Sequence, residues 1–103
     1  MKLNVFERLI GLTVLPKEGD FVTWKMILEL RKKLGLSAEE IEEFEVKVEE
    51  SGNAKWNEKG HEDREIEISG KEIKLVCESL EKINKEKKLE ERHFTLYEKF
   101  VGG

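Results

Sequence analysis

Four side chains capable of chemistry stand side by side in the stretch K-W-N-E-K-G-H-E-D-R: His61, Glu62, Asp63 and Arg64. Imidazole and carboxylate groups can bind a metal ion or move a proton. A zinc or iron site needs three or four ligands that converge on one point. Consecutive residues do not converge in an ordinary loop, and the chain has one cysteine and no H-x-x-x-H pair. We therefore predict no metal or cofactor here, and interpret the stretch as the solvated tip of a small sheet.

Two further side chains could take part in catalysis only with suitable neighbours. His93 falls on the apolar face of the last predicted helix, so we expect a half-buried histidine with one hydrogen-bond partner rather than a general base. Cys77 falls in an apolar helical stripe, where burial keeps a thiol protonated. The sequence has no nucleophile elbow, phosphate-binding loop or dinucleotide-binding glycine pattern. We predict that the protein is not an enzyme and keep a small enzyme that uses His93 as an alternative.

The composition indicates one small domain with a highly charged surface. The 103 residues fit a single domain, and 41% of them are charged against 38% hydrophobic, with a net charge of −4. A lone cysteine excludes an intramolecular disulfide and fits a reducing compartment. No apolar run approaches the ~18 residues of a membrane span, and the N-terminus lacks the apolar segment of a secretory signal. We expect a cytoplasmic location and no membrane partner.

Helix signals occupy both ends of the chain. Asn4, Ser37 and Ser69 are each followed three residues later by Glu, which is the capping-box pattern that starts a helix. Asp20 is a further N-cap, and Gly35 is a natural stop. Helices are predicted over about 5–12, 21–34, 38–44, 70–83 and 90–101. The second of these is apolar around most of its circumference, and we predict it to be the central helix, with Trp24 in the core.

The middle of the chain has the alternation of strands. Apolar and polar residues alternate over 44–49, a turn follows at Ser51-Gly52-Asn53, and residues 54–56 can pair back. Residues 64–68 alternate again. The prediction is an α+β domain in which helices at both ends pack on a two- or three-stranded antiparallel meander. Its parts are a helical part at 1–44, the meander at 44–68 and two helices at 69–101, with Gly102 and Gly103 as a frayed end.

Both ends of the chain resemble a group of known sequences. The stretches are L-N-V-F-E-R-L-I-G-L-T-V-L-P-K-E-G-D-F-V-T-W-K, continuing through L-R-K-K-L-G-L-S-A-E-E-I-E-E-F, and L-E-E-R-H-F-T-L-Y-E-K-F. They are similar to short uncharacterised proteins of bacteriophages and prophages of Gram-positive bacteria. The resemblance covers about half of the chain. It implies a phage or prophage context, with the host cytoplasm as the location, and it implies no activity and no functional residue.

The charges are distributed unevenly, and this directs the functional expectation. Residues 37–67 hold 12 acidic and 4 basic side chains, a local balance of −8, against +3 for residues 1–36. Such a segment repels phosphate, which disfavours direct nucleic-acid binding, and it attracts a basic surface of another protein. The alternative is that this acidic segment only keeps the protein soluble and binds no partner. The candidate partner-binding residues are Trp56, Glu42, Glu45, Glu49 and Glu50.

The sequence leaves three functional hypotheses. The first is a non-enzymatic accessory protein that binds another protein, with Trp56 as an exposed anchor unless it covers the far side of the small sheet. The second is an acidic inhibitor that imitates the charge of a nucleic acid, which requires the glutamates to line one exposed ridge. The third is the small enzyme that uses His93. An exposed strand edge can also pair with a second copy, so a homodimer is expected by that route.

Overall fold

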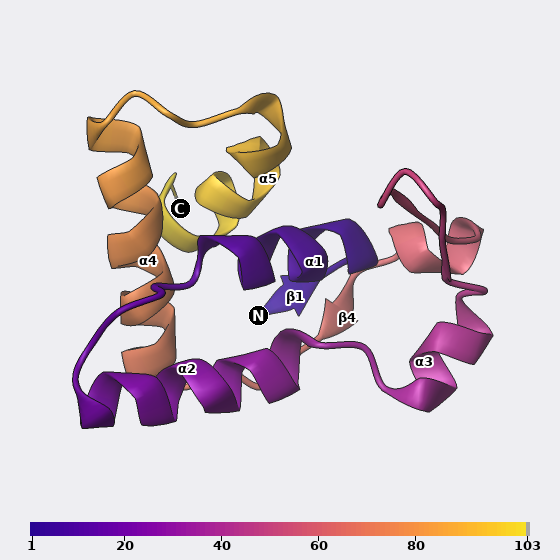
Figure 1. Ribbon diagram of the computed structural model, residues 1–103, viewed down its shortest axis with the longest axis horizontal. Coiled ribbons are helices and arrows are strands. Elements are labelled where there is room, and N and C mark those ends of the chain that lie inside the picture. The colour runs from indigo at the N-terminus through magenta and orange to yellow at the C-terminus, as the bar shows by residue number, and fades with distance from the viewer. Residues whose placement is uncertain (103) are drawn as a thin grey trace.

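Helix α1, Val5–Val14, runs through the middle of the computed structural model, which describes residues 1–102 (Figure 1). The predicted capping box is present, because the Asn4 side chain accepts from the Glu7 amide and the Glu7 carboxylate accepts from the Asn4 amide. Val5, Ile10 and Val14 of α1 are buried, and so are two of its charged residues, Glu7 and Arg8. The central helix is therefore α1.

Helix α2, Phe21–Leu34, lies on one side of α1, so its prediction as the central helix was wrong. Only Ile27, Leu30 and Leu34 are buried, whereas Phe21 is 74% exposed and Leu28 50% exposed. Asp20 caps the helix as predicted. Counting apolar residues around a helix does not reveal how many neighbours pack on it, and here the neighbours cover one face.

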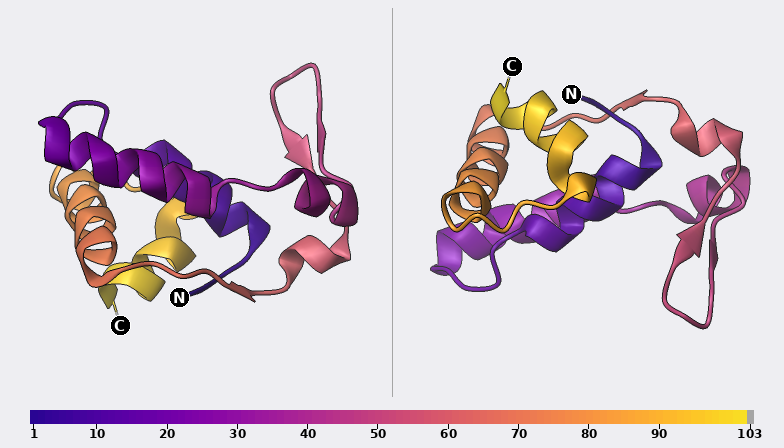
Figure 2. Two further views of the ribbon diagram at one scale, coloured as in Figure 1. Left: turned by 90° about the horizontal axis from the view of Figure 1, so that it is seen from below. Right: turned by 90° about the horizontal axis from the view of Figure 1, so that it is seen from above.

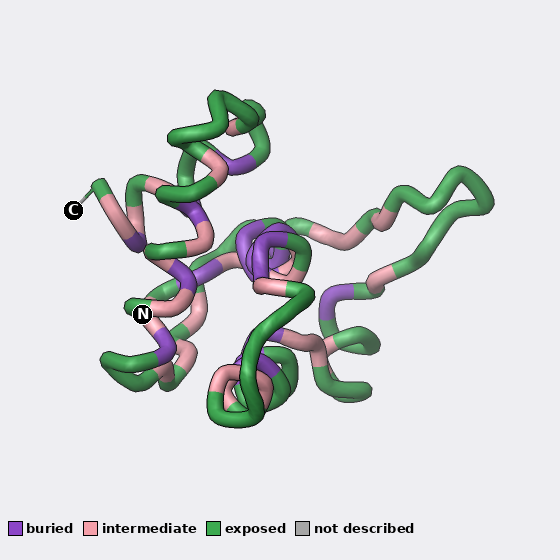
Figure 3. Tube along the Cα trace, turned by 60° about the vertical axis from the view of Figure 1, so that its left-hand side comes forward, coloured by how far each residue is buried: buried purple, intermediate pink, exposed green. Residues whose placement is uncertain are grey.

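The core lies where α1 and α2 meet the C-terminal third of the chain (Figures 1 and 3). Helix α4, Gly70–Lys85, begins at the predicted Ser69 capping box and buries Val76 and Leu80. The predicted last helix is broken into three short pieces, namely the 3-10 turn η2, Glu91–His93, helix α5, Phe94–Tyr97, and the π-helical turn η3, Glu98–Gly102. Gly102 therefore closes a helical turn, and Gly103 lies outside the described residues.

Two separate two-stranded antiparallel sheets replace a single meander, within the predicted α+β class, which is confirmed. Strands β2, Lys47–Val48, and β3, Ala54–Lys55, form the predicted hairpin. The predicted strand at 64–68 is present only as β4, Arg64–Glu65, and pairs with β1, Lys2–Leu3, not with the hairpin. A two-residue strand is too short to show alternation, so no pattern in the sequence indicated β1 as a partner for β4.

The hairpin projects away from the helices instead of packing on them (Figures 2 and 3). It belongs to residues 37–63, which we call the acidic lobe, together with helix α3, Ala38–Glu43, and the 3-10 helix η1, Glu58–His61. The lobe contains 10 acidic and 3 basic residues. The remaining elements form the helical body. Among residues 1–102, no helix is long and apolar enough to cross a membrane.

Candidate functional site

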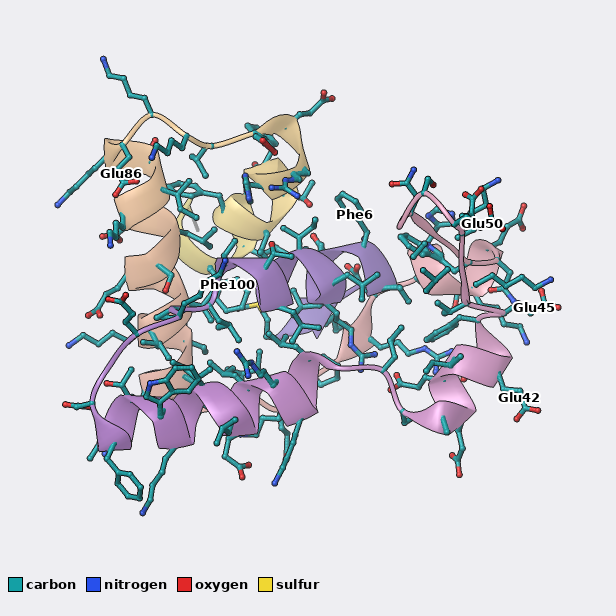
Figure 4. The ribbon with its side chains drawn as sticks, viewed as in Figure 1. Phe6, Glu42, Glu45, Glu50, Glu86 and Phe100 are labelled. Atoms are coloured by element: carbon teal, nitrogen blue, oxygen red, sulfur yellow. The ribbon has the colours of Figure 1, made fainter. Side chains whose placement is uncertain are left out.

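An open groove of about 580 Å³ separates the helical body from the acidic lobe. It is lined by Asn4, Phe6, Trp56, His61, Glu91, Arg92 and Thr95. The ring centroids of Phe6 and Trp56 lie 6.4 Å apart, and those of Trp56 and His61 lie 6.5 Å apart. Figure 4 shows Phe6 projecting from α1 into the space between α5 and the lobe. Aromatic side chains from distant parts of the sequence thus meet in one groove.

Trp56 is held by the turn of chain that follows it. The residue is half-buried, and a Cβ atom at Gly60 would collide with the indole ring, so the glycine allows η1 to pass directly over it. The sequence left two interpretations of Trp56 open, an exposed anchor and a cover for the far side of the small sheet. Trp56 packs on η1 and also lines the groove.

Asn57 joins the two halves of the acidic lobe. Its backbone N–H donates to the Phe44 carbonyl at 2.8 Å, and its side-chain amide donates to the Glu43 carbonyl at 3.0 Å and to the Glu45 carboxylate at 3.2 Å. The Asn57 side-chain oxygen Oδ1 accepts from the Lys59 amide and so caps η1. Glu45 has a φ of 52°, a left-handed conformation that costs energy in a residue with a side chain. The Asn57 contacts hold that conformation.

We expect Asn57→Ala to loosen the lobe by about 1–2 kcal/mol, because an N-cap and two cross-lobe hydrogen bonds are lost together. Amide hydrogen exchange should become faster across the hairpin and η1 and stay unchanged in α1 and α4. Asn53→Ala, in the exposed hairpin turn, is the matched control and should leave exchange in η1 unaltered. Uniform acceleration through the whole chain in Asn57→Ala would contradict a local role.

A small core of its own also stabilises the lobe. Phe44 is 1% exposed, and the Arg64 guanidinium stacks on its ring with 4.5 Å to the ring centroid. The same guanidinium donates to both carboxylate oxygens of Glu43, at 3.1 and 2.6 Å. The hydrogen bond from Arg64 lowers the pKa of Glu43. Arg64, which the sequence offered as a possible reactive group, therefore packs the lobe against β4.

Arg8 fastens the lobe to the body. This guanidinium is 3% exposed and donates to the carbonyl oxygens of Leu34 at 3.0 Å and Gly35 at 2.6 Å, which end α2. It also donates twice to the Glu40 carboxylate of α3, at 2.6 and 3.1 Å. The hydrogen bond from Arg8 lowers the pKa of Glu40 to about 2, despite the opposing effect of burial. One side chain of α1 thus fixes α3 relative to α2.

Lys99 makes a second connection between the lobe and the body. Its ammonium donates to the Glu7 carboxylate at 2.7 Å and to the Lys2 carbonyl at 3.0 Å, and it lies 3.2 Å from the Asp63 carboxylate. Burial alone would lower the pKa of Lys99, but the hydrogen bonds with Glu7 and Asp63 outweigh burial and raise it. Asp63 therefore anchors the end of the lobe to the C-terminal segment.

The side chains of the H-E-D-R stretch make contacts in different parts of the fold. The prediction that this stretch forms the tip of the hairpin was wrong. The two strands of the hairpin are joined by residues 49–53, whereas residues 58–61 form η1. His61 lies beside Trp56, Asp63 beside Lys99, and Arg64 on Phe44. In the described part of the chain, no three His, Cys, Asp or Glu residues are grouped so that they could hold a metal ion.

His93 and Cys77 have structural surroundings. The Nδ1 atom of His93 accepts from the Glu90 amide at 2.9 Å, which agrees with the predicted hydrogen-bond partner. The side chain is 4% exposed and therefore more deeply buried than the predicted half-buried histidine. Cys77 is half-buried, its thiol donates to the Phe100 carbonyl at 3.0 Å, and burial raises its pKa, as expected.

The candidate glutamates differ in how they are engaged. Glu45 accepts from Asn57, and Glu49 lies 3.5 Å from the Lys55 ammonium. Figure 4 shows Glu42, Glu45 and Glu50 along the outer edge of the lobe, from α3 to the hairpin. The four candidate glutamates supply part of the negative charge of the lobe, but they do not line the groove.

The sequence pointed to Trp56 and missed the other wall of the groove. Phe6 occupies the first turn of α1 and is 39% exposed. Its exposure could be judged only once the buried face of α1 was known. Comparisons with protein-family models, with curated proteins and with solved structures find no match to this chain. The assignment of a function therefore rests on the groove and on the charge of the lobe.

Proposed function

We propose that the protein binds another protein through the groove at Phe6 and Trp56. The observation that carries this proposal is the convergence of two aromatic side chains, fifty positions apart in the sequence, in an open groove between two parts of the fold. The partner would supply a segment with one large apolar or aromatic side chain flanked by lysine or arginine. The apolar side chain enters the groove, and the basic residues face the acidic lobe.

Aromatic residues support this role because tryptophan is enriched among the side chains that dominate binding energy. Trp56 and Phe6 are already held by Gly60 and by α1, so little side-chain freedom is lost when a partner docks. The polar rim, with Asn4, Thr95 and Glu91, offers hydrogen-bond partners around an apolar floor. This arrangement resembles the anatomy of protein interfaces, where a polar rim surrounds an apolar centre.

The charge of the lobe supports the basic character of the partner. With 10 acidic and 3 basic residues, the lobe steers a positively charged segment toward the groove beside it. Arg92, at the groove, is paired with Glu90 at 2.6 Å, so it adds little positive charge to oppose that attraction. The resemblance of the two chain ends to phage and prophage proteins is consistent with an accessory protein that meets such a partner in the host cytoplasm.

Selection from a random peptide library tests this proposal. Wild-type protein should enrich peptides that place an aromatic or large aliphatic residue next to lysine or arginine. Trp56→Ala should bind those peptides about 30-fold more weakly, the loss of a hot-spot side chain of ~2 kcal/mol. Phe94→Ser is the matched control, because Phe94 is 64% exposed and does not line the groove. Enriched peptides that bind wild type and Trp56→Ala equally would refute the proposal.

A second candidate function is the acidic inhibitor that imitates a nucleic acid, supported by the line of glutamates along the outer edge of the lobe (Figure 4). The triple variant Glu42→Gln, Glu45→Gln and Glu50→Gln separates the two functions. If the groove binds the partner, this variant should slow association and keep most of the affinity. If charge mimicry dominates, the triple variant should lose binding and Trp56→Ala should retain it.

A further inference from the structure

We infer that the outer surface of α2 and α3 is a self-complementary interface through which two copies of the chain associate. This inference is independent of the groove and replaces the strand edge as the expected contact in a homodimer. Figure 1 shows α2 and α3 in line along the lower edge of the molecule, and the left panel of Figure 2 looks onto that side. Three features of this surface point to a second copy: its exposed apolar side chains, its charges and its dimensions.

The outward face of α2 carries a row of exposed side chains that no other element among residues 1–102 covers. The row is spaced i, i+4, i+7 and i+11 and consists of Phe21, Lys25, Leu28 and Lys32. It lies opposite the buried residues of the helix, and Val22 beside it is 65% exposed. Single exposed apolar residues are normal on a protein surface, but several close together on one helix indicate a surface that binds another molecule.

The outward face of α3 continues this surface with the opposite charge. Glu42 is exposed and points away from the side of α3 that Glu40 occupies, and exposed Glu39 and 44% exposed Ile41 lie on either side of it. Glu40, on the opposite side of the same helix, is held by Arg8 and faces the body. Each copy therefore presents a basic and apolar helix next to an acidic and apolar one, and each half matches the other half of a second copy.

A two-fold axis near residues 35–37, between the two helices, brings α2 of each copy against α3 of the other. Such an interface is closed, because the same pair of contacts forms twice. With about 1.5 Å of rise per residue, α2 is ~21 Å long and α3 ~9 Å long. The described molecule measures 34 × 29 × 28 Å, so one face has room for the ~800 Å² that each partner of a standard interface buries.

Other features of the chain leave the two lysines of the row available for a partner. Arg31 stacks over Trp24 at 5.6 Å, and Lys33 donates to the Glu72 carboxylate at 2.5 Å, so these two side chains are turned toward the chain itself. Lys25 lies 4.9 Å from the ring centroid of Phe21, and Lys32 lies 3.8 Å from Glu29, both at the exposed surface. With Lys25, Lys32 and the neighbouring Glu29, the outside of α2 therefore has a net balance of +1 where α3 is acidic.

The test is sedimentation analysis of charge-reversed variants over a dilution series. Wild type should be a dimer that weakens as salt rises. Lys25→Glu with Lys32→Glu should raise the dimer Kd at least tenfold, and so should Glu39→Lys with Glu42→Lys, because like charges then face each other at both symmetric places. An equal mixture of the two variants should recover dimer, since both contacts become attractive again in the mixed pair.

Recovery in the mixture is the decisive outcome, because unfolding or a change in solubility cannot produce it. Phe94→Ser removes an exposed phenylalanine from α5, on the other side of α1 from α2 (Figure 1), and should remain dimeric. A monomeric wild type would overturn the inference. So would a dimer that tolerates both sets of reversals, or single variants whose mixture stays dissociated.

Discussion

Arg8→Met is expected to lower the free energy of unfolding by about 3–5 kcal/mol, the range for removing one partner of a buried ion pair. Methionine keeps much of the packing of the arginine stem, so the loss reports on the guanidinium. Its removal leaves the carbonyl oxygens of Leu34 and Gly35 and the Glu40 carboxylate without their donor. Because Arg8 alone joins α1, the end of α2 and α3, the lobe should also lose its fixed position.

The acid dependence of stability identifies the Glu40 part of this effect. Glu40 has a folded-state pKa of about 2 against an ordinary value of 4.5. A lowered pKa contributes stability that is complete above pH 4.5 and is lost as the pH falls toward 2, and the shift corresponds to about 3 kcal/mol. Urea unfolding of wild type over that pH range should show the loss, and Arg8→Met should show a correspondingly smaller one. Equal acid dependence in both proteins would contradict the assigned ion pair.

Lys99→Met is expected to have the second-largest effect, about 3 kcal/mol. Glu7 is 2% exposed, and the substitution removes the ammonium that its carboxylate accepts from, leaving a buried charge without its cation. Lys99 also loses its contact with Asp63, so the end of the lobe is released. Urea unfolding at neutral pH measures the change.

Two further variants test the cause of the Lys99→Met effect. Adding Glu7→Gln should recover part of the lost stability, because a neutral amide tolerates the site without a cation. Lys82→Met, on an exposed position of α4, should change stability by less than about 0.5 kcal/mol. If Lys99→Met and Lys82→Met proved equally mild, the Glu7–Lys99 pair would not be stabilising the fold.

The parts of the fold that depend on neighbouring residues could be predicted from the sequence. The capping boxes at Asn4, Ser37 and Ser69 start α1, α3 and α4 where expected, because a cap satisfies amide groups within three residues of itself. The hairpin was also predictable, since its turn and its alternation are local signals. Together these signals were sufficient for the α+β class.

The parts that depend on distant contacts could not be predicted. The pairing of β1 with β4 joins residues more than sixty positions apart through two residues on each strand. Helix α1 can lie at the centre because its charged residues Glu7 and Arg8 find partners in Lys99 and the end of α2. The periodicity of apolar residues does not reveal these partners. Two charged residues in the first turn of a helix normally indicate exposure, because burying a charge is unfavourable unless it is paired. Here the partners of both residues offset that cost.

The candidate site divides along the same line. Trp56 was identified because a tryptophan among polar residues is unusual, whereas Phe6 resembled an ordinary residue of an amphipathic helix. The H-E-D-R stretch attracted attention as chemistry, and it instead supplies Asp63 and Arg64 to the contacts that set the lobe. The walls of the groove therefore depend on the same long-range ion pairs that the two large predictions test.

Peptide titration of ¹⁵N-labelled protein, followed by NMR, tests most directly whether the groove is the binding surface. The probe is the peptide that wild type enriches most strongly. The account predicts that the largest shifts occur at the Trp56 indole N–H and at the amides of Phe6, His61 and Thr95, with little change on the outer face of α2. Shifts centred on the hairpin turn or on α2, with the Trp56 indole unmoved, would contradict it.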